Sequence, residues 1–284
     1  MRESVASHTA LRVAIRRAEH QVLDDPKLFD DPLSLRIIGL EEAAKIQPGV
    51  ISRRQRLTPS FRAFMAVRSR YAEDELALAV AAGIRQYVVL GAGLDTFACR
   101  NPHSGAGLRV FEIDHPATQA WKRARLAAAN IDVPDSVTFV PTDFERETLS
   151  DALRGTAFRF DAPAFFSWLG VTPYLTEGAF TETLAVVAAM PRTSAVVFDY
   201  AVPRESLNEK QKMALDALSA LVGSIGEPFR LFWEPGKLEV RLRQMGFGEI
   251  EDLGREQLNA RYFTGRTDDL RVRANLARLI RAVL

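Results

Sequence analysis

Hydrophobic and polar positions along this chain repeat with a period that changes several times. In residues 9–23, apolar side chains recur every three or four positions with arginines between them, which is the spacing of an amphipathic helix. Prolines at positions 26, 32, 48 and 59 then divide the chain into short segments. The pattern therefore predicts helix and loop structure over the first 70 residues, including another turn or two of helix at 61–67.

From residue 71 onward, predicted helices alternate with short apolar runs. Acidic residues 73–75 are typical of a first helical turn, where negative charge complements the helix dipole, and Gly83 marks a stop for that helix. Continuous apolar strands that alternate with helices indicate a parallel sheet covered on both faces, with ligand sites at the carboxyl ends of the strands. The predicted strands are 87–90, 108–113, 137–140, 164–169, 195–200 and 247–253, and the predicted helices 117–129, 149–153, 176–189, 205–221 and 236–245.

Chemically informative residues follow three consecutive predicted strands. Gly91 and Gly93 end the first strand, where glycine lets the backbone turn sharply and lets a nucleoside approach closely. The second strand ends at Asp114, 21 residues after Gly93, close to the spacing at which an acidic side chain binds ribose hydroxyls. After the third strand, Asp143 can accept a hydrogen bond from an adenine amino group while Phe144 packs on the base. A surface Asp beside a core Phe is the alternative for that pair, but the three loops together favour an adenosine ligand.

Four segments in this order resemble the leucine carboxyl methyltransferase family, and most closely its bacterial branch of S-adenosylmethionine-dependent methyltransferases. The segments are Arg68–Asp74, Leu90–Thr96, Glu112–Pro116 and Tyr174–Thr176, and the similarity runs from about residue 9 to the end. The resemblance implies an α/β, Rossmann-like class I methyltransferase fold, with a seven-stranded sheet whose last strand is antiparallel and helices on both faces. It also implies an N-terminal helical cap at 1–70 and a core at 71–284, with a lid insertion near 204–235.

The resemblance further implies where S-adenosylmethionine binds. The loop after the first strand passes the methionine part of the cofactor, Asp114 binds the ribose, and Asp143 with Phe144 binds the adenine. An arginine of the segment before Tyr71 pairs with the cofactor carboxylate; Arg70 is favoured and Arg68 is left open. The loop residues implied as cofactor-binding are Gly91, Ala92, Gly93 and Asp95.

The acceptor side departs from the family pattern. Leu169 stands where carboxyl methyltransferases carry Glu after the fourth strand, which makes a wall formed with Trp168 and Val171 apolar. We therefore expect O-methyl transfer to a carboxylate or hydroxyl of a small or medium hydrophobic acceptor. Tyr174 is the main catalytic candidate, as an orienting hydroxyl or a packing wall, with core packing as its alternative.

A general base would be needed only for a hydroxyl acceptor, because a carboxylate is already ionised at neutral pH. Besides Tyr174, the sequence offers His20, His115 and Asp199 for that role, none within a sharp motif. His115 is better explained as a structural residue and His20 as a surface histidine.

Composition and charge argue against several other classes of protein. Lys plus Arg total 37 against 36 Asp plus Glu, so the charge gives no global reason to bind nucleic acid or an anionic membrane, and a small-molecule acceptor is expected. The arginine-rich last 30 residues are expected to form a solvated face. A single cysteine, Cys99, excludes an intrachain disulfide and a cysteine zinc cluster, and no histidines have metal-binding spacing. No apolar window approaches the length of a membrane span, and a signal-peptide core is lacking, so a cytoplasmic location is expected.

Two other functions share part of the pattern. An NAD(P)-binding oxidoreductase would have the same strand, glycine turn and distal acid, but Thr96 stands where its third glycine is expected. A non-catalytic cofactor-binding protein on a methyltransferase scaffold is also left open, because only the acceptor side departs from the family. The oligomeric state is not indicated by the sequence.

Overall fold

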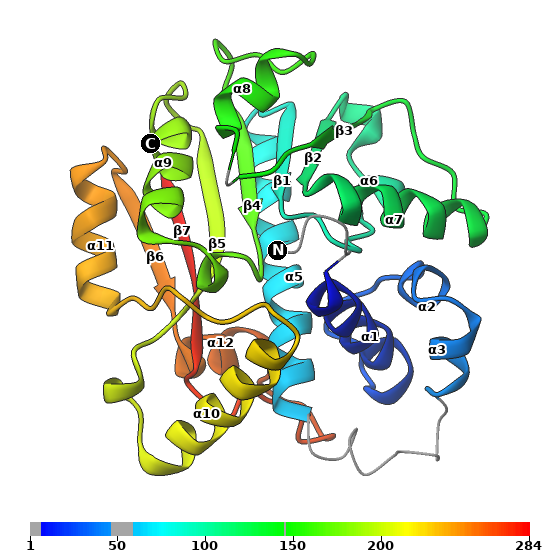
Figure 1. The fold of residues 1–284 in the computed structure, drawn as a ribbon, viewed down its shortest axis with the longest axis vertical. Coiled ribbons are helices and arrows are strands. Elements are labelled where there is room, and N and C mark those ends of the chain that lie inside the picture. The colour runs from blue at the N-terminus through cyan, green and yellow to red at the C-terminus, as the bar shows by residue number, and fades with distance from the viewer. Residues whose placement is uncertain (1–6, 47–58, 145) are drawn as a thin grey trace.

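The computed structural model of the chain describes residues 7–46, 59–144 and 146–284, in which seven strands form a single sheet (Figure 1). The order is β3-β2-β1-β4-β5-β7-β6. Strands β1 to β5 pair with one another in parallel, and β7 is antiparallel to both β5 and β6. The strands are β1 (Gln86–Leu90), β2 (Arg109–Asp114), β3 (Val137–Pro141), β4 (Phe165–Trp168), β5 (Ala195–Ala201), β6 (Glu249–Leu253) and β7 (Ala277–Val283).

Both faces of the sheet are buried, which explains the continuous apolar runs. Because successive side chains of a strand point to opposite faces, Val88 and Leu90 of β1 enter one core and Tyr87 and Val89 enter the other. The first core continues into α8 and α9, and the second into α5. The predicted α/β sheet, with its antiparallel last strand, is confirmed.

Polar residues at the helix starts satisfy backbone N–H groups that have no partner within the helix. Thr176, which was predicted as a cap, accepts a hydrogen bond from the Ala179 N–H at 3.2 Å, and Ser7 does the same for Ala10 at 3.1 Å. The helices are α1 (His8–Leu23), α2 (Ser34–Ile37), α3 (Leu40–Ala44), α5 (Pro59–Ala81), α6 (Phe97–Arg100), α7 (Pro116–Ala128), α8 (Leu149–Arg154), α9 (Glu177–Ala188), α10 (Glu209–Ser224), α11 (Pro235–Gln244) and α12 (Arg255–Tyr262).

Helix α5 corrects the prediction for residues 59–81. Instead of a short helix followed by a second one that begins at the acidic residues 73–75, one helix of 23 residues runs through the whole segment. The three acidic residues occupy positions in the middle of this helix, and each has an ion-pair partner. Glu73 pairs with Arg100, Asp74 with Arg70 and Glu75 with Arg261. The cap boundary placed at residue 70 therefore falls inside a continuous helix.

Only part of the C-terminal segment forms the predicted solvated face: the side chains of Arg255, Arg271 and Arg273 are 37–55% exposed, but β7 is not solvated. Strand β7 lies between β5 and β6, and its Leu279 and Ile280 are fully buried. The arginines on either side of these two residues pair with acids of β6: Arg278 with Asp252, and Arg281 with Glu249. The strand tolerates these charges because the neighbouring strand neutralises them.

Helix α1 lies beyond the carboxyl edge of the parallel strands. Figure 1 shows the arrow of β4 pointing toward the half of the molecule that holds α1 and α10. Helix α1 packs against α5 and α2 there, and its apolar side chains form a small separate core with Leu94 after β1. Within the described residues, no helix has the length and apolar character needed to cross a membrane.

Phe198→Ala is expected to lower the free energy of unfolding by about 3–5 kcal/mol, because it removes a fully buried ring and leaves a cavity. Phe198 lies on β5 with Trp168 and Phe180 around it. Chemical denaturation measures the loss. Leu78→Ala is the control, since that side chain is 63% exposed and its removal is expected to cost about 0.5 kcal/mol or less. Equal losses in the two variants would contradict the placement of Phe198 in the core.

Candidate functional site

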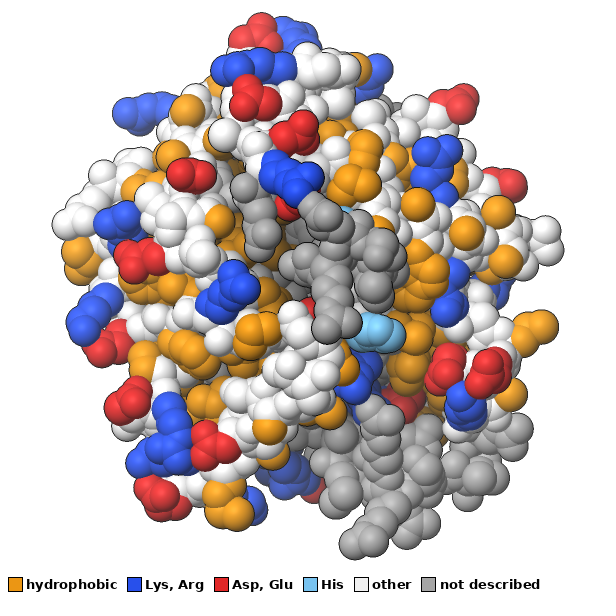
Figure 2. All heavy atoms as spheres, in the orientation of Figure 1, with side chains coloured by type: hydrophobic (Ala, Val, Ile, Leu, Met, Phe, Trp, Pro, Cys, Tyr) orange, Lys and Arg blue, Asp and Glu red, His pale blue; other side chains and the backbone are white. Residues whose placement is uncertain are grey.

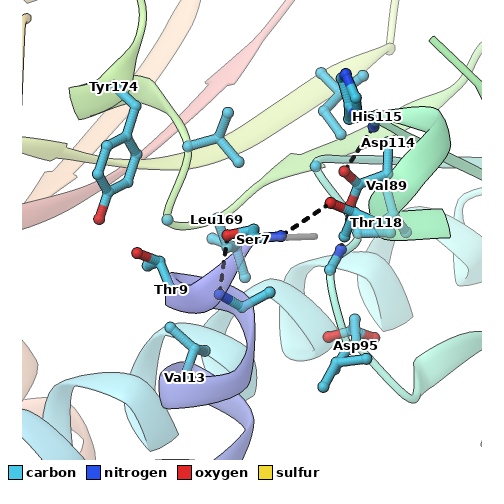
Figure 3. Close-up of a pocket in the computed structure, with 18 of the residues that line it drawn as sticks. Ser7, Thr9, Val13, Val89, Asp95, Asp114, His115, Thr118, Leu169 and Tyr174 are labelled. Atoms are coloured by element: carbon cyan, nitrogen blue, oxygen red, sulfur yellow. Dashed lines mark hydrogen bonds between the residues drawn. The ribbon is translucent and has the colours of Figure 1, made fainter. Parts of the chain in front are cut away.

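A cavity of about 310 Å³ lies at the carboxyl ends of the parallel strands. Four strands contribute the segments that follow them, and α1 and α5 supply further walls. The volume is within the range of small-molecule and cofactor sites. Figure 3 shows Tyr174 and Thr9 at one side of this cavity and Asp114 and His115 at the other. The strand-end segments that line it are 91–95 after β1, 114–115 after β2, 142–144 after β3 and 169–171 after β4.

The glycines after β1 are required by close contacts on two sides. Gly91 and Gly93 have φ values of +66° and +50°, which L side chains rarely adopt. A Cβ atom at Gly91 would overlap Val171 Cγ2, and one at Gly93 would lie 3.1 Å from Ala10 Cβ in α1. The loop thus fits between the segment after β4 and the cap helix only because these positions lack side chains.

Asp114 is bound to the glycine loop. Its carboxylate accepts hydrogen bonds from the Gly93 N–H and from the His115 N–H, the latter at 2.7 Å. Burial raises the pKa of Asp114 above its ordinary value, and these two hydrogen bonds lower it only in part. His115 itself caps α7, because its Nδ1 accepts a hydrogen bond from the Ala117 N–H at 3.3 Å. This hydrogen bond gives His115 Nδ1 a structural role, as the sequence analysis expects for this residue.

Asp143 and Phe144 line the same cavity as Gly91 and Asp114. A backbone hydrogen bond of 2.8 Å, from the Thr142 N–H to the Asp114 carbonyl, joins the loop after β3 to the end of β2. The glycine, acid and Asp-Phe loops that were predicted from three separate strands are thus brought together at one edge of the sheet.

Arg68 and Arg70 lie on different sides of α5, and of the two only Arg68, not the favoured Arg70, lines the cavity. Arg68 lines the cavity with its side chain 7% exposed, and its Nη1 donates a hydrogen bond of 2.9 Å to Asp199. Arg70 is outside the cavity lining, 49% exposed, and pairs with Asp74 one turn along the helix. Two residues two positions apart on a helix point about 200° apart, so only one of them can face the cavity.

Asp199, considered as a base, is buried outside the cavity lining and holds the cavity wall in place. Its carboxylate accepts hydrogen bonds from Arg68 and from the Gly170 N–H. Gly170 has a φ of +73°, and a Cβ there would lie 2.8 Å from Arg68 Nη2. Asp199 therefore fixes the guanidinium of Arg68 against the turn after β4.

The acceptor-side wall differs in part from its prediction. Leu169 and Val171 line the cavity, but Trp168 does not: it is buried in the sheet core, where it stacks on Phe180 at a centroid distance of 5.4 Å. Side chains alternate along a strand, so Trp168 and Leu169 face opposite ways. Tyr174 lines the cavity, and its ring packs against that of Phe229 with 5.2 Å between the ring centroids.

His20 is neither a surface residue nor part of the cavity lining. Its Nε2 accepts hydrogen bonds from the Leu28 and Phe29 N–H groups at 2.9 and 3.2 Å, and its Nδ1 lies 2.8 Å from Asp24 Oδ2. The ring is completely buried, so it organises the loop after α1.

Burial raises the pKa of Cys99 to about 11, which keeps that thiol protonated.

Sequence reasoning missed a buried ionic cluster beside the cavity, which we call the ionic cluster: Arg17, Asp31, Glu73, Asp95 and Arg100. Arg17 donates to Asp31 and to Asp95, each at 2.7 Å, and Arg100 binds Glu73 through both terminal nitrogens. The arginines of α1 look solvent-facing in the sequence because they alternate with apolar residues. Nothing in the periodicity shows that acids from two other segments bind Arg17.

Glu227, in the segment after α10, is a second residue that the sequence did not single out. It lines the cavity and accepts hydrogen bonds from both the N–H and the hydroxyl of Thr9, the former at 3.2 Å. The predicted lid insertion and the cap helix thus meet over the cavity. The acid itself lies in a Gly-Glu-Pro turn, which carries no motif.

The pKa of Asp95 leads to a pH prediction. Burial alone would raise it, but Arg17, Arg100 and Lys122 lower it to about 2. Because this is below the value of about 3.9 for an unfolded Asp, ionised Asp95 stabilises the fold above about pH 4, and this contribution is lost as the pH falls through about 2. The difference in free energy of unfolding between wild type and Asp95→Asn is expected to shrink over that interval. A difference independent of pH would contradict the ion pair.

Comparison with known proteins agrees with this geometry. The family model of leucine carboxyl methyltransferases matches residues 10–188. A Bacillus subtilis (strain 168) protein named "Putative S-adenosyl-L-methionine-dependent methyltransferase YktD" is 31% identical over 291 residues, which cover 95% of each chain.

Solved structures show the same fold at low sequence identity. A methyltransferase-named structure from Thermobifida fusca has a TM-score of 0.56 and 19% identity, with 95% of this chain and 93% of that chain covered. A DUF574 family protein from Streptomyces avermitilis has a TM-score of 0.57 and 16% identity, with 98% and 97% covered. With the strand order, these likenesses identify the class I methyltransferase fold. The chain belongs to the leucine carboxyl methyltransferase family and is an S-adenosylmethionine-dependent methyltransferase.

Proposed function

We propose that this enzyme transfers the methyl group to an oxygen atom, a carboxylate or a hydroxyl, of a small or medium hydrophobic acceptor. The observation that carries the proposal is the composition of the cavity around Tyr174. There Leu169, Val171 and Leu175 supply apolar walls, while the polar groups are the Tyr174 hydroxyl, the Glu227 carboxylate with its partner Thr9, and Arg230. Such a surface favours an acceptor with an apolar body and a single oxygen-bearing group.

The opposite half of the cavity fits the cofactor. The positive φ values and close contacts of Gly91 and Gly93 leave backbone without side chains along one wall, and Asp114 stands at the end of β2 where ribose hydroxyls can be bound. Arg68 offers a planar guanidinium for a carboxylate, and Asp143 with Phe144 a place for adenine. When bound, the cofactor supplies a methyl group on a sulfonium centre for in-line transfer.

Tyr174 is proposed to orient the acceptor rather than to remove its proton. Burial raises its pKa, a hydrogen bond with Thr9 lowers it and the Glu227 charge raises it, with the result at about 12. The phenol therefore stays protonated at neutral pH and can donate a hydrogen bond to an acceptor oxygen. A hydroxyl acceptor would need a base, for which the Glu227 carboxylate lies on the same side of the cavity; a carboxylate acceptor would need none.

The surface supports a small-molecule acceptor over nucleic acid. On the face seen in Figure 2, lysines and arginines are interspersed with acidic side chains, and no continuous basic stripe covers its described part. The net charge of +1 gives no general attraction to phosphate backbones.

Arg68→Lys is expected to weaken binding of S-adenosylhomocysteine about tenfold, because an ammonium cannot form the paired hydrogen bonds of a guanidinium with the ligand carboxylate. Arg70→Lys is the matched control: same helix, same substitution, outside the cavity, and an unchanged dissociation constant is expected. Calorimetry on both variants measures this. If Arg70→Lys alone weakens binding, the assignment of Arg68 is wrong.

The acceptor chemistry is tested with cofactor labelled in its methyl group, incubated with cell extract and analysed by mass spectrometry. Base-labile methyl esters are expected for carboxyl transfer and stable ethers for hydroxyl transfer. Label only in RNA or on protein lysines would refute O-methylation of a small acceptor.

Tyr174→Phe is expected to slow the labelled reaction about tenfold, the size of one lost hydrogen bond in the transition state, without weakening S-adenosylhomocysteine binding. Tyr262→Phe is the control, because that hydroxyl bonds to Asp74 away from the cavity. Equal rates in Tyr174→Phe and wild type would remove Tyr174 from the reaction.

A further inference from the structure

We propose that Glu73, together with Asp95, binds the α-ammonium group of the cofactor's amino-acid end. Glu73 has no assigned role, and the inference depends on S-adenosylmethionine dependence but not on which atom is methylated. It starts from the face that α5 presents to the cavity.

One face of α5 carries complementary charges along the cavity. Arg68, Ser69, Ala72 and Glu73 all line it. Arg68 and Ala72 are four positions apart, as are Ser69 and Glu73, so the members of each pair are neighbours on the helix surface. A guanidinium is thus placed a little more than one turn from a carboxylate. A free α-amino acid carries its carboxylate and ammonium on one carbon, so a cation and an anion at neighbouring points of one wall match both of its charges.

The ionic cluster leaves negative charge at this wall. Its three carboxylates face two guanidiniums, so one negative charge is uncompensated within the cluster. Glu73, Asp95 and Arg17 line the cavity, but the two acids are 21% and 23% exposed while Arg17 is only 5% exposed; Asp31 lies outside the lining and is completely buried. Asp95 acts on Glu73 closely enough to raise its pKa, after burial and against the charge of Arg100. A ligand cation is the group that would relieve this repulsion.

Two buried hydroxyls beside these acids have unused hydrogen-bonding capacity. Tyr87 and Ser167 line the cavity, are 4% and 2% exposed, and share one hydrogen bond of 2.7 Å. Tyr87, Glu73 and Asp95 line the same cavity, and burial, followed by the charges of the two acids, raises the pKa of Tyr87. Each hydroxyl can make up to three hydrogen bonds.

An ammonium group requires three acceptors, and this corner of the cavity provides them. Carboxylate oxygens of Glu73 and Asp95 and a hydroxyl of the Tyr87–Ser167 pair form a set that suits a compact donor of positive charge. Arg68 on the same helix face then meets the ligand carboxylate. The amino-acid end is thereby bound through both of its charges.

The test compares two ligands on one variant. S-adenosylhomocysteine carries the ammonium, and 5′-S-(3-carboxypropyl)-5′-thioadenosine is the same molecule with hydrogen in place of the amino group. Glu73→Gln is expected to weaken the first about tenfold or more and the second less than about threefold, as calorimetry measures. Asp74→Asn is the matched control, since it neutralises the adjacent residue of the same helix outside the cavity lining, and is expected to leave both affinities unchanged.

Each remaining outcome decides against the proposal. An equal loss for the two ligands would mean that Glu73 acts only through Arg100 and the shape of the cavity. Unchanged binding of S-adenosylhomocysteine would mean that the ammonium lies elsewhere. Should Glu73→Gln fail to fold, Glu73→Asp keeps the negative charge beside Arg100 and withdraws it by one methylene; its smaller loss must still be confined to the ligand that carries the amino group.

Discussion

A single guanidinium, that of Arg17, holds the cap helix to the loop that follows the first strand. It binds Asp31 and Asp95 at 2.7 Å and Thr96 at 3.1 Å, and its side chain is 5% exposed. Removing one partner of a buried ion pair typically costs 3–5 kcal/mol, since the remaining charge is left unpaired. The position of α1, and with it one whole wall of the cavity, depends on this contact.

The site also depends on the order of the strands. Strand β1 lies inside the sheet with β2 on one side and β4 on the other, so the crossovers leave in opposite directions and a crevice opens at its carboxyl end. Gly91 is the first residue after β1 and therefore lies at this crevice. Helix α1 then covers the crevice, and its Ala10 approaches Gly93 so closely that a larger residue at either position would push the cap away.

How well the sequence predicts a feature of this structure depends on whether that feature is determined by neighbouring residues or by residues distant in the chain. Strands β1, β4 and β5 are predicted well because their burial on both faces produces unbroken apolar runs, whereas β7 was missed because Arg278 and Arg281 interrupt its apolar run. Gly91, Gly93 and Asp114 are found because backbone geometry and strand ends are local properties. The choice between Arg68 and Arg70 depends on the rotational setting of α5, which was hidden while the segment was read as two helices. Glu73, Arg17 and Glu227 could not be recognised, because their partners come from segments up to 218 positions away, as in the Thr9–Glu227 contact.

Helix α5 has an evolutionary consequence. It begins among the cap residues and ends at the first strand, and buried side chains such as Phe64 and Leu76 lie on both sides of residue 70. A recombination event at that position would cut the helix in two and leave each half without the turns that cover its apolar surface. A unit that is exchanged between related enzymes together with the cofactor-binding core would therefore have to include all of α5, so residue 70 cannot serve as a module boundary.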